Sequence, residues 1–299
     1  MPSLFDEFDD ASASSHGEDL LAGLNPPQRQ AVTHSGGPLL IVAGAGSGKT
    51  RVLTRRVAHL LAERGVMPGE VLAITFTNKA AGEMRGRVEE LVGPRARQML
   101  VSTFHSACVR FLRRDAQQIG FTSTFTIYDQ GDALSLVKMV ETTLGIDIER
   151  PEFKPRAVLN AISNAKNELI DSDGYTMRAS SPYERVISEV YREYQLRLRL
   201  ANAMDFDDLI MNTVVMLRSV PEIRDYYRRR FRHILVDEYQ DTNHAQYALI
   251  RELVGLRGEE VPPAELCVVG DADQSIYAFR GATIRNIEEF ERDYPRSEE

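Results

Sequence analysis

The stretch PLLIVAGAGSGKT places a lysine and a threonine directly after an apolar run and a glycine-rich turn. Its three glycines allow backbone N–H groups to curl around phosphate oxygens, where side chains would block the approach. Lys49 supplies a positive charge for the β- and γ-phosphates, and the Thr50 hydroxyl is suited to Mg²⁺. We therefore predict a nucleotide-binding loop made of Ala43 (where the pattern usually has its first glycine), Gly44, Ala45, Gly46, Ser47, Gly48, Lys49 and Thr50.

A pair of acidic residues follows a second apolar run, in FRHILVDEYQDTN. Residues 234–236 have the composition of a buried strand and lead directly into Asp237 and Glu238. Acidic side chains at the carboxyl end of a core strand lie where ligands bind in open α/β sheets. Asp237 is the expected Mg²⁺ ligand, together with Thr50, and Glu238 is expected to polarise the attacking water. With the glycine-rich loop, these acids predict a P-loop NTPase.

The elements that must position these groups alternate between strand and helix patterns. Residues 39–42 are four strand-forming residues in a row, and residues 51–65 carry apolar side chains on one helical stripe. Three further apolar runs, in VLAITFTNKAAGEM, MLVSTFHS and ELCVVGDADQSIYAFRG, end in polar residues and precede helical or turn patterns. This alternation predicts an α/β fold with a mostly parallel sheet and right-handed crossovers.

Residues 121–204 interrupt the alternation. The segments DALSLVKMVETTL, PRAVLNAISNAKNEL and YERVISEVYREYQLRLRL show helical spacing, and the whole stretch is too long to be a loop. We therefore predict a helical insertion. Its basic residues either contact phosphates or form solvated helix faces; they are Lys154, Arg156, Lys166, Arg192, Arg197 and Arg199.

After residue 24, the motifs and their order resemble the amino-terminal half of the UvrD/PcrA/Rep-type superfamily 1 DNA helicases. The segments that carry the resemblance are LNPPQRQAV, AGAGSGKT, ITFTNKAAGEM, STFHS, DFDDL, VDEYQDTN and VGDADQSIYAFRGA. The resemblance implies a RecA-like P-loop NTPase core, domain 1A, formed by residues 24–120 and 205–299. It also implies a helical domain 1B, formed by residues 121–204, which contributes to the DNA surface. Residues 1–23 carry acidic side chains but no lysine or arginine, and we expect a disordered tail there.

The resemblance also implies roles for single residues. Gln28 would read the adenine edge, which an amide side chain can bond bidentately. Gln274 would sense the γ-phosphate and join Lys49, Asp237 and Glu238 as a catalytic residue. Aromatic side chains suit the DNA path because they stack on bases of any sequence. The residues expected to contact DNA are Phe76, Asn78, Thr103, Phe104, His105, Tyr277 and Phe279, the last of which stands where the family more often has tryptophan.

Composition sets wider bounds on the class of protein. A net charge of −8 does not point to nucleic acid, although a basic groove can lie on an acidic body. Cys108 and Cys267 lie in apolar stretches without metal-ligand spacing, so we expect core residues in a reducing compartment. No apolar run is long enough to span a bilayer, and the start of the chain lacks the features of a signal peptide. We expect a cytoplasmic protein without a membrane partner.

The patterns predict an NTPase that uses ATP and Mg²⁺, and the resemblance implies an ATP-dependent DNA helicase or translocase of repair or replication. The resemblance implies 3′→5′ movement on single-stranded DNA and on junctions of single- and double-stranded DNA. It also implies a second ATPase-like domain after residue 299, so we expect this chain to be part of a longer motor. Alone it should be nearly inactive, because Arg280 is its one candidate for the arginine that stabilises the transferring phosphate.

Two alternatives remain open at this point. The first is the helicase subunit of a RecB/AddA-like helicase–nuclease, whose nuclease would lie beyond residue 299. The second is a non-catalytic, nucleotide-dependent interaction module, against which Lys49, Asp237, Glu238 and Gln274 argue, since a binding module needs no group that activates water. Repair or transcription proteins are further expected partners that the sequence does not identify.

Overall fold

The computed structural model describes residues 20–44, 46–271, 290 and 292–294. The chain divides into two compact units. Unit 1 comprises residues 1–104, 226–242 and 253–299, and unit 2 comprises residues 105–225 and 243–252. The insertion predicted at residues 121–204 falls within unit 2, and its limits as a domain stay a prediction.

Unit 1 contains a five-stranded parallel sheet. Its strands, in spatial order, are β1 (Leu39–Val42), β7 (Glu265–Gly270), β6 (His233–Val236), β2 (Val71–Thr75) and β3 (Leu100–Thr103). Every residue of β2 and β6 is buried, which is the pattern of strands inside a parallel sheet. The register pairs Val42 with Gly270 and Val236 with Val268, so β1, β7 and β6 end at the same edge.

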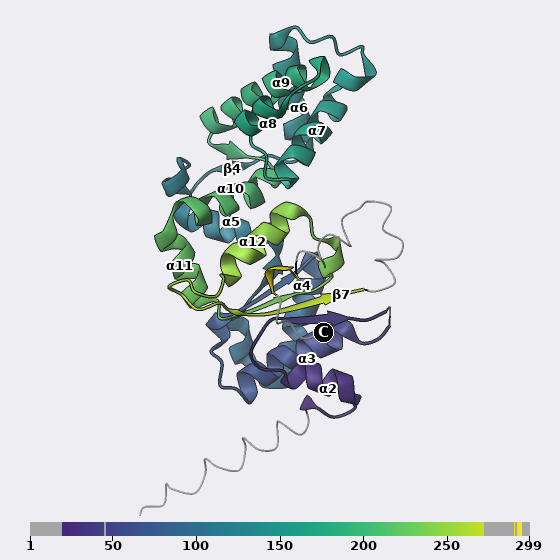
Figure 1. The fold of residues 1–299 in the computed structure, drawn as a ribbon, viewed down its shortest axis with the longest axis vertical. Coiled ribbons are helices and arrows are strands. Elements are labelled where there is room, and N and C mark those ends of the chain that lie inside the picture. Colours follow the sequence, from purple (N-terminus) through teal and green to yellow (C-terminus); the bar gives the residue numbers. More distant parts are fainter. Residues whose placement is uncertain (1–19, 45, 272–289, 291, 295–299) are drawn as a thin grey trace, which may run out of the picture. The chain divides into compact units, whose positions relative to one another are not determined.

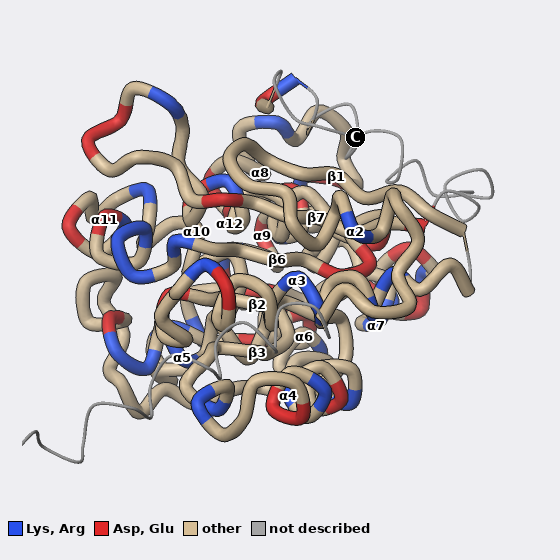
Figure 2. Tube along the Cα trace, turned by 90° about the horizontal axis from the view of Figure 1, so that it is seen from below, with Lys and Arg blue, Asp and Glu red and all other residues tan. Residues whose placement is uncertain are grey.

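Three helices of unit 1 support this sheet and its loops: α2 (Pro26–Thr33), α3 (Lys49–Ala62) and α4 (Asn78–Val92). Buried side chains of α3 and α4 share a core with residues of the strands; among them are Leu53, Val57, Met84, Val88, Val101 and Leu235. The outer side of α4 is charged, and Glu83 lies within ion-pair distance of Lys79 and Arg87. Figure 2 shows both signs of charge along this helix, as on an ordinary solvated face.

Unit 2 is mainly helical. Its core is formed largely by α6 (Gln130–Leu144), α7 (Pro155–Asn167) and α9 (Pro182–Leu200), with the short α8 (Ser172–Arg178) beside α9 (Figure 1). The helices α5 (Phe104–Asp115) and α10 (Phe206–Ser219) flank this group in the sequence. Among the described residues, three helices contain residues of both units: α5, through its first residue, α11 (Pro221–Arg230) and α12 (His244–Val254). Short 3₁₀ turns connect the elements; they are Pro68–Glu70, Pro94–Gln98, Ala116–Ile119, Pro151–Phe153 and Tyr239–Asp241.

The structure confirms the predicted α/β class and the mostly parallel sheet. It also contains a small parallel pair that the sequence did not indicate, β4 (Thr126–Ile127) with β5 (Ala203–Met204). Strands of two residues are too short to show an alternating pattern, which explains why the segment read as purely helical. Within the described residues, no helix has the length and apolar composition needed to cross a membrane.

Candidate active site

The glycine-rich loop joins the end of β1 to the start of α3. Gly46 and Gly48 have φ angles of +74° and +86°, in the left-handed region that favours glycine. A Cβ atom added at Gly48 would also lie 3.3 Å from the side-chain nitrogen of Gln28. Lys49 begins α3 directly after this turn, so the positive end of the helix dipole faces the loop. The local sequence therefore builds a cradle for an anion.

The Lys49 ammonium group has three acceptors close to it. Its Nζ donates to the carbonyl oxygens of Ala43 (2.8 Å) and Gly44 (3.2 Å) and to Oδ2 of Asp271 (2.8 Å). Asp271 follows β7 directly, at the sheet edge where β1 also ends. A lysine has three N–H donors, so these contacts use its full capacity. A phosphate that binds Lys49 must therefore replace one of these partners.

The two predicted acidic residues stand at the end of β6. The backbone N–H of Asp237 still donates to the Ile74 carbonyl (2.9 Å), which extends the sheet by one residue. Burial raises the pKa of the Asp237 carboxyl to about 6, and the charge of Glu238 adds to this effect. Opposing both, the backbone N–H of Glu238 donates to Asp237 Oδ1 (3.1 Å), and the Lys49 charge favours the ionised form. Asp237 is thus a carboxylate that a nearby cation would hold ionised.

Glu238 has an unusual backbone conformation. Its φ angle is +49°, so a residue with a side chain occupies the left-handed region. Its carboxylate Oε2 accepts a hydrogen bond from the side-chain nitrogen of Gln240 at 2.7 Å. Strained backbone and a fixed carboxylate are common features of residues that act on a substrate.

The donor set fits Mg²⁺. No group of three or more His, Cys, Asp or Glu side chains that could hold a metal ion occurs among the described residues. Mg²⁺ typically takes one or two protein oxygens and completes its shell with water and substrate phosphates. Thr50, in the first turn of α3, and Asp237, directly after β6, carry oxygens of that kind.

Gln28 belongs to α2 and is tied to the phosphate loop. Its amide nitrogen donates to the Ser47 carbonyl (2.9 Å), and its Oε1 accepts from the Asn25 N–H (3.1 Å) within a capping box. A glutamine amide has two N–H groups and two lone pairs, so one donor and one acceptor remain for a ligand. That pair is what the predicted contact with an adenine edge requires.

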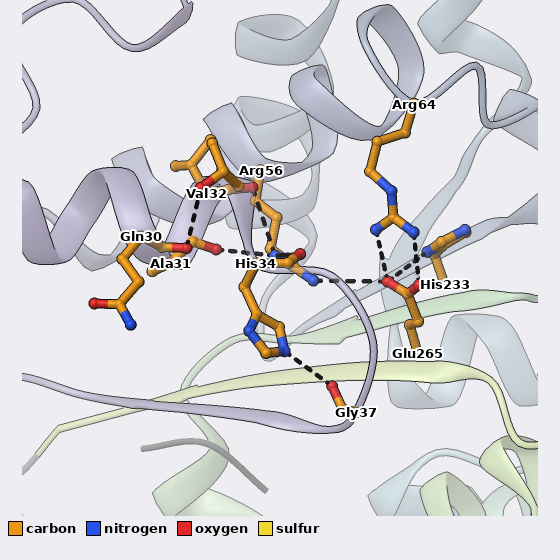
Figure 3. Close-up of polar contacts among 10 residues, drawn as sticks. Gln30, Ala31, Val32, His34, Gly37, Arg56, Arg64, His233 and Glu265 are labelled. Atoms are coloured by element: carbon orange, nitrogen blue, oxygen red, sulfur yellow. Dashed lines mark hydrogen bonds and ion pairs between the residues drawn. The ribbon is translucent and has the colours of Figure 1, made fainter.

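Arg56 of α3 anchors the carboxyl end of α2 (Figure 3). The Nη1 atom of this buried guanidinium donates to the carbonyl oxygens of Ala31 (2.9 Å) and His34 (2.8 Å). Glu265 of β7 accepts two hydrogen bonds from Arg64, at 2.8 and 2.6 Å, and lies 3.9 Å from Arg56 Nη2. His233 Nδ1 lies 3.5 Å from the same carboxylate. The helix that carries Gln28 is thus fixed to the sheet that carries the acids.

The predicted DNA-contact residues in unit 1 differ in exposure. Phe76 is half-buried and Asn78 is exposed at the start of α4, so both can meet a ligand. Thr103 is buried at the end of β3. Phe104 is 2% exposed and packs edge-on against Phe76, with 5.7 Å between ring centroids. The Phe104 ring thus supports Phe76 in this structure, and its predicted contact with DNA stays a prediction.

In unit 2, His105 lies beside an aromatic residue that sequence reasoning missed. The ring of Phe206 is 51% exposed, and its centroid lies 5.4 Å from that of His105. Burial lowers the pKa of His105, which favours the neutral imidazole. The signal was present in DFDDL, where a large apolar side chain stands among acids on the first turn of a helix.

Lys166 is wholly buried and pairs with Asp205 Oδ2 (2.7 Å) and Asp208 Oδ1 (2.8 Å), so a role for it as a phosphate contact or a solvated side chain is wrong. Asp271 and Gln240 were not singled out, although Asp271 follows a core strand just as Asp237 does. Ala45, Gln274, Tyr277 and Phe279, with Arg280, lie outside the described residues.

Similarity to known proteins agrees with these observations. The chain is 65% identical over 287 residues to the ATP-dependent DNA helicase UvrD1 of Mycobacterium tuberculosis, covering 94% of this chain and 37% of the relative. It is 51% identical over 278 residues to the ATP-dependent DNA helicase PcrA of Bacillus subtilis, covering 93% and 36%. The chain thus spans less than two fifths of the length of these relatives. A family model described as the UvrD/REP helicase N-terminal domain matches residues 24–295. The chain belongs to the UvrD/REP helicase N-terminal domain family.

Proposed function

We propose that unit 1 binds ATP with Mg²⁺ and hydrolyses the γ-phosphate bond as the motor of a DNA helicase or translocase. The observation that carries the proposal is that β1, β7 and β6 are neighbouring parallel strands whose carboxyl ends lie on the same side of the sheet. These neighbouring strands deliver Lys49, Asp271 and the pair Asp237 and Glu238 to one place. The names of the relatives, which are ATP-dependent DNA helicases, support it.

Binding begins with an exchange of partners at Lys49. Phosphate oxygens replace Asp271 or a loop carbonyl as acceptors of the ammonium group, and the N–H groups around Gly46 and Gly48 turn toward them. Gln28 bonds the base through its remaining donor and acceptor. Thr50 and Asp237 would hold Mg²⁺, which neutralises charge on the β- and γ-phosphates when it is bound.

Hydrolysis requires a positioned water. In the proposed step, Glu238 orients this water in line with the γ-phosphorus and takes its proton as the oxygen–phosphorus bond forms and the bond to the β-phosphate oxygen breaks. Lys49 stabilises negative charge that develops on the phosphate oxygens. Gln274 is proposed to sense the γ-phosphate from the segment that also carries Tyr277 and Phe279.

The proposed nucleic-acid contacts need no recognition of sequence. Phe76, Asn78, His105 and Phe206 provide rings and an amide that can stack on or bond single-stranded DNA. Stacking on one aromatic ring is worth about 1–3 kcal/mol per base, whatever the base. We further propose movement in the 3′→5′ direction and action at junctions of single- and double-stranded DNA.

The test uses the complete protein and its Glu238→Gln variant. Wild type should hydrolyse ATP faster when single-stranded DNA is added, and Glu238→Gln should bind a nucleotide analogue normally while its kcat falls about 10²- to 10⁴-fold. Phe206→Ala should weaken DNA binding and leave nucleotide affinity unchanged. Normal hydrolysis by Glu238→Gln would remove the water-activating role from this residue and contradict the proposal.

A further inference from the structure

Gln240 joins two parts of the site that are distant in sequence. Its side-chain Nε2 donates to Glu238 Oε2 at 2.7 Å, and its Oε1 accepts from the backbone N–H of Asp271 at 3.0 Å. The residue is 4% exposed and sits in the 3₁₀ turn Tyr239–Asp241, directly after Glu238. A buried amide with both ends bonded has one orientation, so Gln240 is a rigid bridge.

One end of the bridge orients the Glu238 carboxylate. A glutamate side chain has three rotatable bonds, and the left-handed backbone of Glu238 redirects it away from the strand direction of β6. The hydrogen bond from Gln240 selects one arrangement of that side chain. Because the donor is an amide, it does so without placing a full positive charge beside the carboxylate.

The other end of the bridge leads to the phosphate-binding lysine. Asp271, whose N–H bonds Gln240, pairs through its carboxylate with Lys49 Nζ at 2.8 Å. The preceding residue, Gly270, accepts a hydrogen bond from the Ala43 N–H of the phosphate loop at 3.2 Å. Side chains and backbone thus form a continuous series of contacts from Glu238 through Gln240 and Asp271 to Lys49.

We propose that Gln240 is a positioning residue that holds the Glu238 carboxylate in register with the phosphate-binding loop. It contacts no reacting atom itself, and it sets where Glu238 stands relative to Lys49. The inference rests on the proposed ATPase function of the site. Its consequence is specific: loss of Gln240 affects the chemical step more than nucleotide binding, because the loop, Lys49 and Gln28 are left in place.

Two substitutions in the complete protein separate the two bonds. Gln240→Glu keeps an oxygen that can accept from Asp271 N–H, but it replaces the donor to Glu238 with a second carboxylate that repels the Glu238 carboxylate. Gln240→Met has a similar volume and loses both bonds. The matched control is Gln246→Met: Gln246 is a glutamine of similar burial (7% exposed), and its Oε1 accepts from Asn243 N–H at 2.9 Å in the first turn of α12.

Steady-state ATP hydrolysis with single-stranded DNA, analogue binding and thermal unfolding are measured for all four proteins. We expect kcat to fall about 10- to 100-fold in both Gln240 variants, since a displacement of about 1 Å has that effect on a catalytic group. KM for ATP and analogue affinity should change less than about threefold, in contrast to loss of a binding contact. Gln246→Met should keep the wild-type kcat.

The outcomes distinguish this inference from the function on which it rests. If wild type hydrolyses ATP and both Gln240 variants keep its kcat, or lose affinity with kcat preserved, the positioning role is overturned alone. If wild type binds no nucleotide and hydrolyses none, the proposed function fails and takes the inference with it. Should Gln240→Met unfold, the nearly isosteric Gln240→Glu still decides, because it retains the bond to Asp271.

Discussion

Lys49 in unit 1 and Lys166 in unit 2 both donate to an aspartate at short distance, 2.8 and 2.7 Å respectively, but their surroundings differ. The Lys49 side chain is 11% exposed, and two of its three acceptors are carbonyls of the loop on which it stands. The Lys166 side chain has no exposed surface, lies between two carboxylates and has the rings of Tyr191 and Tyr194 within 5.9 and 5.1 Å.

The difference concerns which of the two lysines an incoming anion can reach. Burial alone would lower the pKa of Lys166, but the charges of Asp205 and Asp208 raise it above its ordinary value, so it stays protonated in the core. No incoming phosphate can reach it without unfolding its surroundings. In the proposed function, Lys49 exchanges a loop carbonyl or Asp271 for a phosphate oxygen, because its side chain is partly exposed. For binding an anion, solvent access and exchangeable hydrogen-bond partners therefore matter more than the charge of the lysine.

The largest expected effect on stability comes from replacing Lys166. Lys166→Met should lower the free energy of unfolding by about 3–5 kcal/mol, because it leaves Asp205 and Asp208 buried without a counter-charge. Denaturant unfolding measures the change, and Lys154→Met, at an exposed position of unit 2, is the control with an expected change within about 0.5 kcal/mol. Equal stability of Lys166→Met and wild type would show that the cluster does not hold unit 2 together.

A smaller effect is expected at Glu265, the acid in the ion-pair cluster of unit 1. Burial acts to raise the pKa of Glu265, but hydrogen bonds and charges from Arg64 and His233 lower it well below its ordinary value. Glu265→Gln should therefore lower the free energy of unfolding by about 1–3 kcal/mol at pH 7. Screening of the ion pair by solvent reduces this effect.

The sign of its pH dependence follows from the lowered pKa. Wild type gains stability from the ionised carboxylate above the ordinary pKa near 4.5 and loses it as the pH falls toward the lower folded-state value. The stability difference between wild type and Glu265→Gln should thus shrink below about pH 4.5. Unfolding curves at pH 7 and pH 3 test this, and a difference independent of pH would contradict it.

The smallest expected effect is stabilising and concerns Glu141 of α6. This side chain is buried, neither carboxylate oxygen has a hydrogen-bond partner among the described residues, and burial raises its pKa to about 7. The stability of wild type falls progressively as the pH rises from the ordinary glutamate pKa near 4.5 to about 7, because burial of Glu141 disfavours its ionised form in the folded protein.

Glu141→Gln mimics the protonated acid, so it should unfold a few degrees above wild type at pH 8 and at about the same temperature at pH 4.5. Thermal unfolding at the two pH values measures this. A destabilised variant at pH 8 would mean that the carboxylate has a favourable partner when ionised.

Short local patterns predicted the loop that carries Lys49 but not the burial of Lys166. The apolar run before the glycine turn predicted β1, Lys49 and Thr50, because strand, loop and helix start are contiguous in sequence. Lys166 meets Asp205 across 39 residues, and Lys49 meets Asp271 across 222. Such pairs depend on tertiary packing, and helical spacing made Lys166 look like any surface cation. The burial of Phe104 was not predicted either, because its packing against Phe76, which belongs to a separate segment, depends on the fold.

Nucleotide binding by purified residues 1–299 tests the central claim most directly. A fluorescent ATP analogue with Mg²⁺ is titrated into wild type, Lys49→Ala and Lys154→Met under identical conditions. Loss of charged hydrogen bonds worth about 1.5–3 kcal/mol should weaken binding by Lys49→Ala roughly 10- to 100-fold, while Lys154→Met binds as wild type does. Equal affinity of wild type and Lys49→Ala would contradict the assignment of this loop as the phosphate site.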